Sequence, residues 1–177
     1  AMLAVAIMLI AKVLDWKDIL SEKGAWDAMF WMGGLVALAT ALAKSGFIAW
    51  IAKLIGTAVA AANMGWIASF VLISLIYIYS HYCFASVTAR ISAMYAAFVA
   101  VAAACGVPAM LVAITFGCFA NLPISLTHYG NGCGPVYFGA GYVSQGEWWR
   151  NGFIITTINV VIWLTIGMAW WKFIGLY

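Results

Sequence analysis

The sequence predicts an all-α integral membrane protein, and two observations carry this prediction. Hydrophobic residues make up 67% of the 177 residues and charged residues 7%, whereas soluble domains are about half apolar and about one quarter charged. Residues 54–146 contain a single formal charge, that of Arg90. Because a membrane-spanning helix needs about 20 apolar residues, this stretch is long enough for about three or four passes.

The chain opens on an apolar run, AMLAVAIMLIAK, without an initiator methionine or the basic start of a signal peptide. We interpret residues 1–14 as the end of a longer hydrophobic segment, and the chain as a fragment of a longer protein. Charged residues then mark 12–27 as a loop at a membrane surface, and Gly, Pro and Asn mark the later turns. The predicted helices are 1–14, 25–43, 47–61, 64–84, 89–105, 107–120, 134–144 and 150–175.

The composition disfavours other classes of protein. A net charge of +3 provides no basic stripe for a nucleic acid. The four cysteines show neither CxxC pairs nor a metal-like spacing with the two histidines, so we expect them to pack as small hydrophobic side chains. An enzyme using His81, His128 and Cys133 would need a base and a nucleophile held together, and the sequence shows no such spacing. We therefore expect no catalytic role, no metal and no nucleic-acid partner.

A first polar break interrupts the apolar stretch in the segment HYCFASVTAR. An ionisable group at membrane depth is costly and should face protein, water or a ligand. We predict a re-entrant hairpin whose tip is Ser86-Val87-Thr88, with the N-terminus of the next helix and two hydroxyls forming an anion site. The alternative is an ordinary helix in which Ser and Thr bond to backbone carbonyls. The two ionisable residues, His81 and Arg90, also have structural alternatives: His81 as a hydrogen-bonding group and Arg90 paired with a helix C-terminus.

A second break lies in NLPISLTHYGNGCGPVYFGAGY, residues 121–142. Pro and Gly are so frequent that residues 128–135 cannot form a continuous helix. Non-helical backbone at membrane depth lines a cavity or is buried in protein, and interrupted helices of this kind form binding sites in transporters. The alternative, a hairpin outside the membrane, stays open at this point. The candidate ligand side chains are Ser125, Thr127, His128 and Asn131.

The sequence resembles a known family in three segments. These are FASVTARISAMYAAF, the later SLTHYGNGCGPVYFGAGYV, and AWDAMFWMGGLVALATALAKSGFIAWIAK. They are similar to the C-terminal half of the divalent anion:sodium symporter family, from about Ala25 to the end of the chain. The greatest similarity is to its branch of citrate/succinate, tartrate/succinate and chloroplast 2-oxoglutarate/malate exchangers.

The resemblance implies a fold with two inverted repeats, each with a re-entrant hairpin and an interrupted helix, of which this chain holds one. Residues 1–62 are then expected in a scaffold, 63–149 in the transport part that binds substrate, and 150–177 in a C-terminal transmembrane helix. By position, the resemblance assigns substrate binding to both breaks and anion or ion support to neighbouring residues. The implied substrate-binding residues are Ser86, Val87, Thr88, Thr127, His128, Asn131, Gly132 and Pro135, and the implied supporting residues are Arg90, Ser125 and Gly130.

The function that follows from the resemblance is secondary active transport of dicarboxylates or tricarboxylates such as malate, 2-oxoglutarate, succinate, citrate or tartrate. Val87 stands where the symporters carry Asn, which favours anion exchange. The alternative is a sodium-coupled dicarboxylate or sulfate symporter with Na⁺ near Ser86 and Asn131. No other cofactor is expected. The implied partners are small organic anions, membrane lipid, the missing N-terminal repeat and a second copy in a homodimer, in a bacterial inner membrane.

Overall fold

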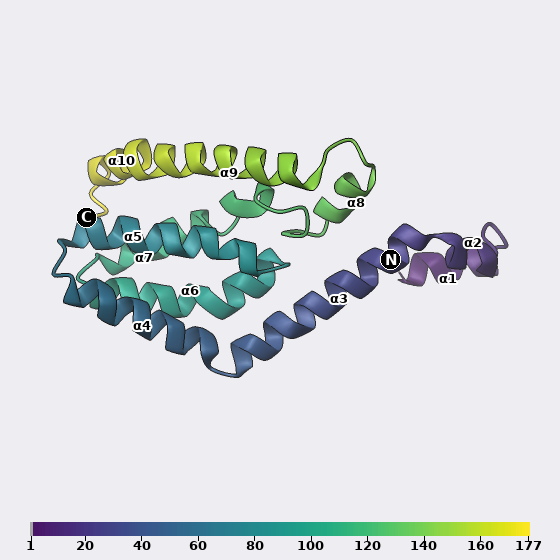
Figure 1. The fold of residues 1–177 in the computed structure, drawn as a ribbon, viewed down its shortest axis with the longest axis horizontal. Helices are drawn as coiled ribbons and strands as arrows, with labels where there is room; N and C mark the ends of the chain where they lie inside the picture. The colour runs from purple at the N-terminus through teal and green to yellow at the C-terminus, as the bar shows by residue number, and fades with distance from the viewer. Residues whose placement is uncertain (1) are drawn as a thin grey trace.

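The computed structural model describes residues 2–177, with the side chains of residues 2, 27, 28, 31, 32, 35, 36, 39, 43 and 60 left out. Residue 1 of the predicted segment 1–14 lies outside the described residues. The N-terminal part consists of helices that lead up to a bundle (Figure 1). These are α1 (Met2–Ile10), α2 (Trp16–Ser21), α3 (Lys23–Lys44) and α4 (Phe47–Ala61).

The turn between α3 and α4 shows how the local sequence sets this part of the fold. The predicted break between the helices 25–43 and 47–61 is confirmed, and Gly46 in this turn has a φ of +76° that glycine adopts readily. The long helix α3 carries α1 and α2 away from the bundle, whereas α4 folds back and packs against α6 (Figure 1).

The bundle follows the turn at residues 62–65. Helix α5 (Trp66–Tyr79), the 3₁₀ turn η1 (Ser80–Cys83) and α6 (Val87–Ala104) form an antiparallel pair on which α7 packs (Figure 1). A π-helical turn, η3, continues α9 into α10, so that residues 145–173 form one long rod along the side of α5 (Figure 1). The elements after α6 are α7 (Ala109–Cys118), η2 (Leu122–Ser125), α8 (Gly134–Gly139), α9 (Gln145–Ile162), η3 (Trp163–Gly167) and α10 (Met168–Phe173).

The predicted loop at 12–27 is wrong, because this range contains α2 and the start of α3. Among the other bounds that differ from the prediction, two have local reasons. The predicted helix 134–144 is too long: α8 ends at Gly139, and Gly141 adopts a φ of +76° that turns the chain toward α9. Helix α9 begins at Gln145 instead of residue 150, because Ser144 and Glu147 form a capping box. In that motif the Ser hydroxyl accepts from the N3 amide while the Glu carboxylate accepts from the N-cap amide.

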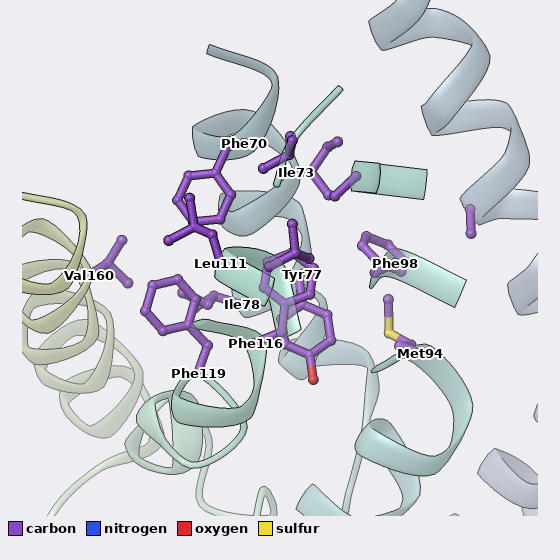
Figure 2. Packing of buried hydrophobic residues seen from close by; sticks show 14 of the residues in the cluster. Phe70, Ile73, Tyr77, Ile78, Met94, Phe98, Leu111, Phe116, Phe119 and Val160 are labelled. Atoms are coloured by element: carbon purple, nitrogen blue, oxygen red, sulfur yellow. The ribbon is translucent and has the colours of Figure 1, made fainter. Parts of the chain in front are cut away.

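The core lies where α5, α6 and α7 meet, and the long rod closes one side. The ring of Tyr77 stacks on Phe116 with centroids 4.6 Å apart and tilts against Phe98 at 5.7 Å. Figure 2 shows these rings together with Phe119 and Val160. Lipid tails are as apolar as these side chains, so close van der Waals packing holds this core together.

The described part of the chain contains three helices that are long and apolar enough to cross a membrane, at Trp66–Cys83, Val87–Ala104 and Gln145–Phe173. The rod also exposes a row of large apolar side chains, including Phe153, Ile158 and Ile166. Such a surface suits lipid or another apolar partner. The all-α transmembrane fold is thereby confirmed. The re-entrant insertion of the α5–α6 hairpin stays a prediction, because both arms are long enough to span.

Candidate functional site

The first break is an abrupt change of backbone between α5 and α6. After the 3₁₀ turn, Phe84 and Ser86 are extended, with Ser86 at φ −147° and ψ 131°. The Ser86 hydroxyl accepts a hydrogen bond from the Ala89 amide at 3.4 Å and so caps α6. The alternative of Ser86 within a continuous helix is therefore wrong. Ser86 and Val87 are half-buried and Thr88 is exposed, so the predicted tip is accessible.

The start of α6 has the properties of an anion site. Among the described hydrogen bonds, the backbone amides of Val87 and Thr88 donate to no acceptor. The first amides of a helix are free by construction, and the aligned peptide dipoles place about half a positive charge at that end. The hydroxyl of Thr88 lies one residue into the helix. Together these groups provide donors and a positive potential where the chain turns.

Arg90 lies one turn further along α6 and is fully buried. Its guanidinium donates to the Tyr77 carbonyl at 2.9 Å and to the Phe119 and Ala120 carbonyls at 3.1 and 2.7 Å. It also lies 4.6 Å above the ring of Tyr77. These carbonyls lie at the C-terminal ends of α5 and α7. The structure therefore shows the alternative predicted for Arg90, in which its side chain pairs with helix C-termini. Because the hydrogen bonds of Arg90 go to backbone carbonyls, its side chain can support an anion only through the electrostatic field of its positive charge.

The charge of Arg90 has no carboxylate partner nearby in sequence, since residues 54–146 contain no Asp or Glu. Helix C-termini carry negative partial charge, so the carbonyls offset part of the cost of burial. The net result is a positive potential inside the bundle. That potential lies one helical turn from the uncapped amides of α6, and it favours an anion there.

The second break runs from η2 to α8, and Asn131 organises it. The Asn131 side-chain oxygen accepts from the Cys133 and Gly134 amides at 2.8 and 2.7 Å, and its amide nitrogen donates to the Ile124 carbonyl at 3.3 Å. These bonds fold the loop over the start of α8, where Pro135 occupies an early helical position. The structure thus places the carboxamide of Asn131 on backbone groups. Gly132 is exposed beside it.

The two breaks meet. The Tyr129 hydroxyl donates to the Tyr82 carbonyl at 2.8 Å. A Cβ added at Gly130 would lie 2.5 Å from Nε2 of His81 and 2.9 Å from Oγ1 of Thr127, so only glycine fits between them. His81 and Thr127 are fully buried, and their side-chain polar atoms make no hydrogen bond in the described structure. The sequence-predicted segments are therefore adjacent, with buried polar groups at their contact.

The start of α9 completes the site with residues that the sequence did not single out. A Cβ at Gly152 would lie 2.9 Å from the Ser125 carbonyl carbon and closer still to its oxygen, so helix and loop touch through backbone. The Ser125 hydroxyl lies 3.3 Å from that of Thr156. The Trp149 indole nitrogen donates to Nδ1 of His128 at 3.4 Å. Neither Gly152 nor Trp149 stands in either polar break, and so neither is predicted at the site.

Within residues 2–177, apart from the side chains left out, no three His, Cys, Asp or Glu side chains gather as metal ligands. The site is instead built from backbone amides, hydroxyls, one half-buried imidazole and a buried guanidinium. Such groups bind and orient an anion but supply no paired acid and base. The geometry therefore fits recognition of an anionic solute.

Comparison with known proteins identifies the family. The family model of the sodium:sulfate symporter transmembrane region matches residues 1–177. The chain belongs to this family. It is therefore an integral membrane protein of a transporter family, and not of an enzyme family, as the sequence motifs indicate.

Several known proteins are similar along all or nearly all of the chain. Chloroplastic dicarboxylate transporter 1 of Spinacia oleracea is 44% identical over 177 residues, which are 31% of its length. A putative malate transporter of Bacillus subtilis is 45% identical over 177 residues, or 37% of its length. An inner membrane protein of Escherichia coli is 34% identical over 172 residues, or 36% of its length. The chain spans about a third of the length of these relatives.

Proposed function

We propose that the chain is the C-terminal part of a carrier that moves dicarboxylates or tricarboxylates across a membrane by anion exchange. The observation that carries this proposal is that the two helix breaks are in contact beside the buried guanidinium of Arg90. Residues 54–146 contain no Asp or Glu that could neutralise this charge. The names of the relatives, which specify dicarboxylate and malate transporters, support the substrate class. Malate, 2-oxoglutarate, succinate, citrate and tartrate are the candidates.

A carboxylate must lose water when it enters such a site, and the protein has to replace those hydrogen bonds. The amides of Val87 and Thr88 and the hydroxyls of Ser86 and Thr88 are the donors at the first break. His128 is the half-buried donor at the second break, where the glycine-rich backbone lets substrate approach closely. The field of Arg90 favours the dianion over a neutral solute. No covalent bond changes in this process.

Exchange follows if the empty carrier moves slowly. Among the described residues, the buried polar atoms of His81 and Thr127 have no hydrogen-bond partner, and unpaired polar groups are costly in a dry path. Val87 offers no side-chain ligand where the resemblance places Asn in the symporters, which weakens a sodium site near Ser86. The second candidate is nevertheless a sodium-coupled dicarboxylate or sulfate symporter, because the family name includes sodium and sulfate.

The carrier needs partners beyond this chain. We propose that the N-terminal repeat of the same protein supplies the other half of the site and that two copies form a homodimer in lipid. In this arrangement residues 1–62 belong to the scaffold, 63–149 move with the substrate, and 150–177 anchor the moving part. The apolar outer face of the α9 rod supports contact with lipid. The membrane is a bacterial inner membrane.

Transport assays with the intact carrier in proteoliposomes test this proposal. Uptake of labelled malate or 2-oxoglutarate should require an internal dicarboxylate and should not depend on Na⁺. Uptake into empty vesicles would contradict exchange, and uptake that needs a sodium gradient would favour the second candidate. Ser86→Ala and Thr88→Ala should each raise KM, by roughly three- to tenfold for a lost hydrogen bond, without changing membrane insertion. Wild-type KM in both variants would overturn the assignment of the tip.

A further inference from the structure

The imidazole of His128 is held by aromatic residues from two helices. Its ring stacks on Phe138 of α8, with centroids 4.2 Å apart and an interplanar angle of 27°. Tyr129 packs edge-on against it at 5.1 Å. On the side of α9, the Trp149 indole nitrogen donates to Nδ1 at 3.4 Å. These contacts fix the plane of the ring while leaving His128 half-buried.

The indole hydrogen bond determines which ring nitrogen carries the proton. Indole N–H is a donor only, so Nδ1 of His128 must be the acceptor and must be unprotonated. A neutral imidazole has one N–H group, which is then at Nε2. Among the described hydrogen bonds Nε2 of His128 has no partner. The ring therefore presents a neutral donor, whereas the opposite tautomer would present a lone pair.

Trp149 is itself held at the meeting point of the two breaks. Its ring packs against Tyr82 at 5.6 Å and against Tyr129 at 6.3 Å. The hydrogen bond from the Tyr129 hydroxyl to the Tyr82 carbonyl, 2.8 Å long, ties these two residues together. The Trp149 indole thus contacts residues of both breaks, and it also donates a hydrogen bond to the His128 imidazole.

We propose that Trp149 is a positioning residue that holds His128 in the Nε2–H tautomer, so that His128 donates to a substrate carboxylate. This inference rests on the proposed function and deepens it. A carboxylate accepts hydrogen bonds and cannot donate them. In the other tautomer the Nε2 lone pair would face the carboxylate oxygen and repel it. Trp149 therefore acts on affinity through His128 and makes no contact with substrate.

Two matched variants separate this role from simple packing. Trp149→Phe keeps an aromatic ring against Tyr82 and Tyr129 but removes the N–H donor. Trp148→Phe is the control, because Trp148 is the neighbouring residue of the same type and its indole N–H donates to none of the described acceptors. Its ring packs edge-on against Phe138, at 6.0 Å. Both substitutions remove the same atoms from the same turn of α9.

The experiment uses the intact carrier with ¹⁵N-labelled histidine, measured by solid-state NMR, together with malate uptake in proteoliposomes. His128→Asn assigns the His128 resonances by their loss. We expect the Nε2–H tautomer in the wild type and in Trp148→Phe, and a mixture of tautomers in Trp149→Phe. The KM of Trp149→Phe should rise roughly three- to tenfold, as for one hydrogen bond, with Vmax unchanged.

The outcomes distinguish this inference from the proposed function. An unchanged tautomer in Trp149→Phe, or equal KM values for the two Phe variants, would overturn the role of Trp149 while leaving malate transport intact. A mixed tautomer with wild-type KM would overturn the donation from His128 to substrate. A wild-type carrier that takes up no dicarboxylate would overturn the proposed function, and the tautomers would still show whether Trp149 positions His128.

Discussion

The contact between α9 and the second break depends on the absence of one side chain at Gly152. A Cβ at this position would lie 2.9 Å from the Ser125 carbonyl carbon, 3.0 Å from Leu126 Cα, and closer still to the Ser125 oxygen. These are backbone atoms, so no side-chain rotation relieves the overlap. In Gly152→Ala the helix and the loop must move apart, and the contact between the Ser125 and Thr156 hydroxyls, now 3.3 Å, is lost.

The magnitude follows from two opposing effects. Overpacking in a well-packed interior costs about 1–3 kcal/mol, and loss of a hydrogen bond between hydroxyls adds about 0.5–1.5 kcal/mol. Replacing Gly by Ala inside a helix recovers up to about 1 kcal/mol. We therefore expect Gly152→Ala to destabilise the carrier by roughly 0.5–3.5 kcal/mol. The site should also loosen, since Ser125 and His128 belong to the segment that is displaced.

A thermal unfolding assay of the intact carrier in detergent checks this expectation. The control is Gly146→Ala in the first turn of the same helix, where a Cβ meets nothing within 4 Å. Gly146→Ala should leave the melting temperature unchanged or raise it, whereas Gly152→Ala should lower it by several degrees. Equal melting temperatures for the two variants would refute the reasoning from backbone contact.

The remaining predictions concern Arg90 and Asn131. Arg90→Gln should reduce the yield of folded carrier in size-exclusion chromatography, because three backbone carbonyls lose a charged donor, each worth about 1.5–3 kcal/mol. Arg90→Lys keeps the charge and should therefore fold better and retain more affinity for a dianion; identical behaviour of the two variants would contradict the field effect. Asn131→Ala should destabilise the loop by about 0.5–2 kcal/mol in a denaturation assay, as a lost cap does. Asn131→Asp keeps the accepting oxygen but loses the donor to the Ile124 carbonyl, so it should be destabilised less than Asn131→Ala while KM rises by charge repulsion, and equal destabilisation by Ala and Asp would count against capping.

Local signals in the sequence located both breaks. The polar tip at Ser86 was recognisable because hydroxyls and an arginine interrupt an apolar run, and the Ser side chain does cap the helix that follows. The glycines and prolines of 128–135 likewise predicted non-helical backbone, which the structure shows. The predicted boundary is wrong where a cap competes with a turn, as at Ser144, whose capping box starts α9 earlier than predicted.

The roles of individual side chains were harder to predict. Arg90 was expected either to support an anion or to bind a helix C-terminus, and only the packing of α5 and α7 around it selects the carbonyls. Asn131 resembled a ligand by position, yet its carboxamide holds the loop. The pairing of Trp149 with His128 joins residues 21 apart in sequence. No periodicity or local motif encodes such a contact.

By itself, the sequence determined that the chain lies in a membrane and that helical backbone is interrupted in two segments, since apolar composition and the backbone limits of Gly and Pro act locally. It also determined the family, through motifs that stand in both breaks. The tertiary structure alone decided that the breaks touch, that the Arg90 guanidinium donates to carbonyls at helix ends, and that Trp149 of α9 donates to His128. These contacts depend on how separate helices pack, and packing joins residues whose spacing along the chain carries no signal.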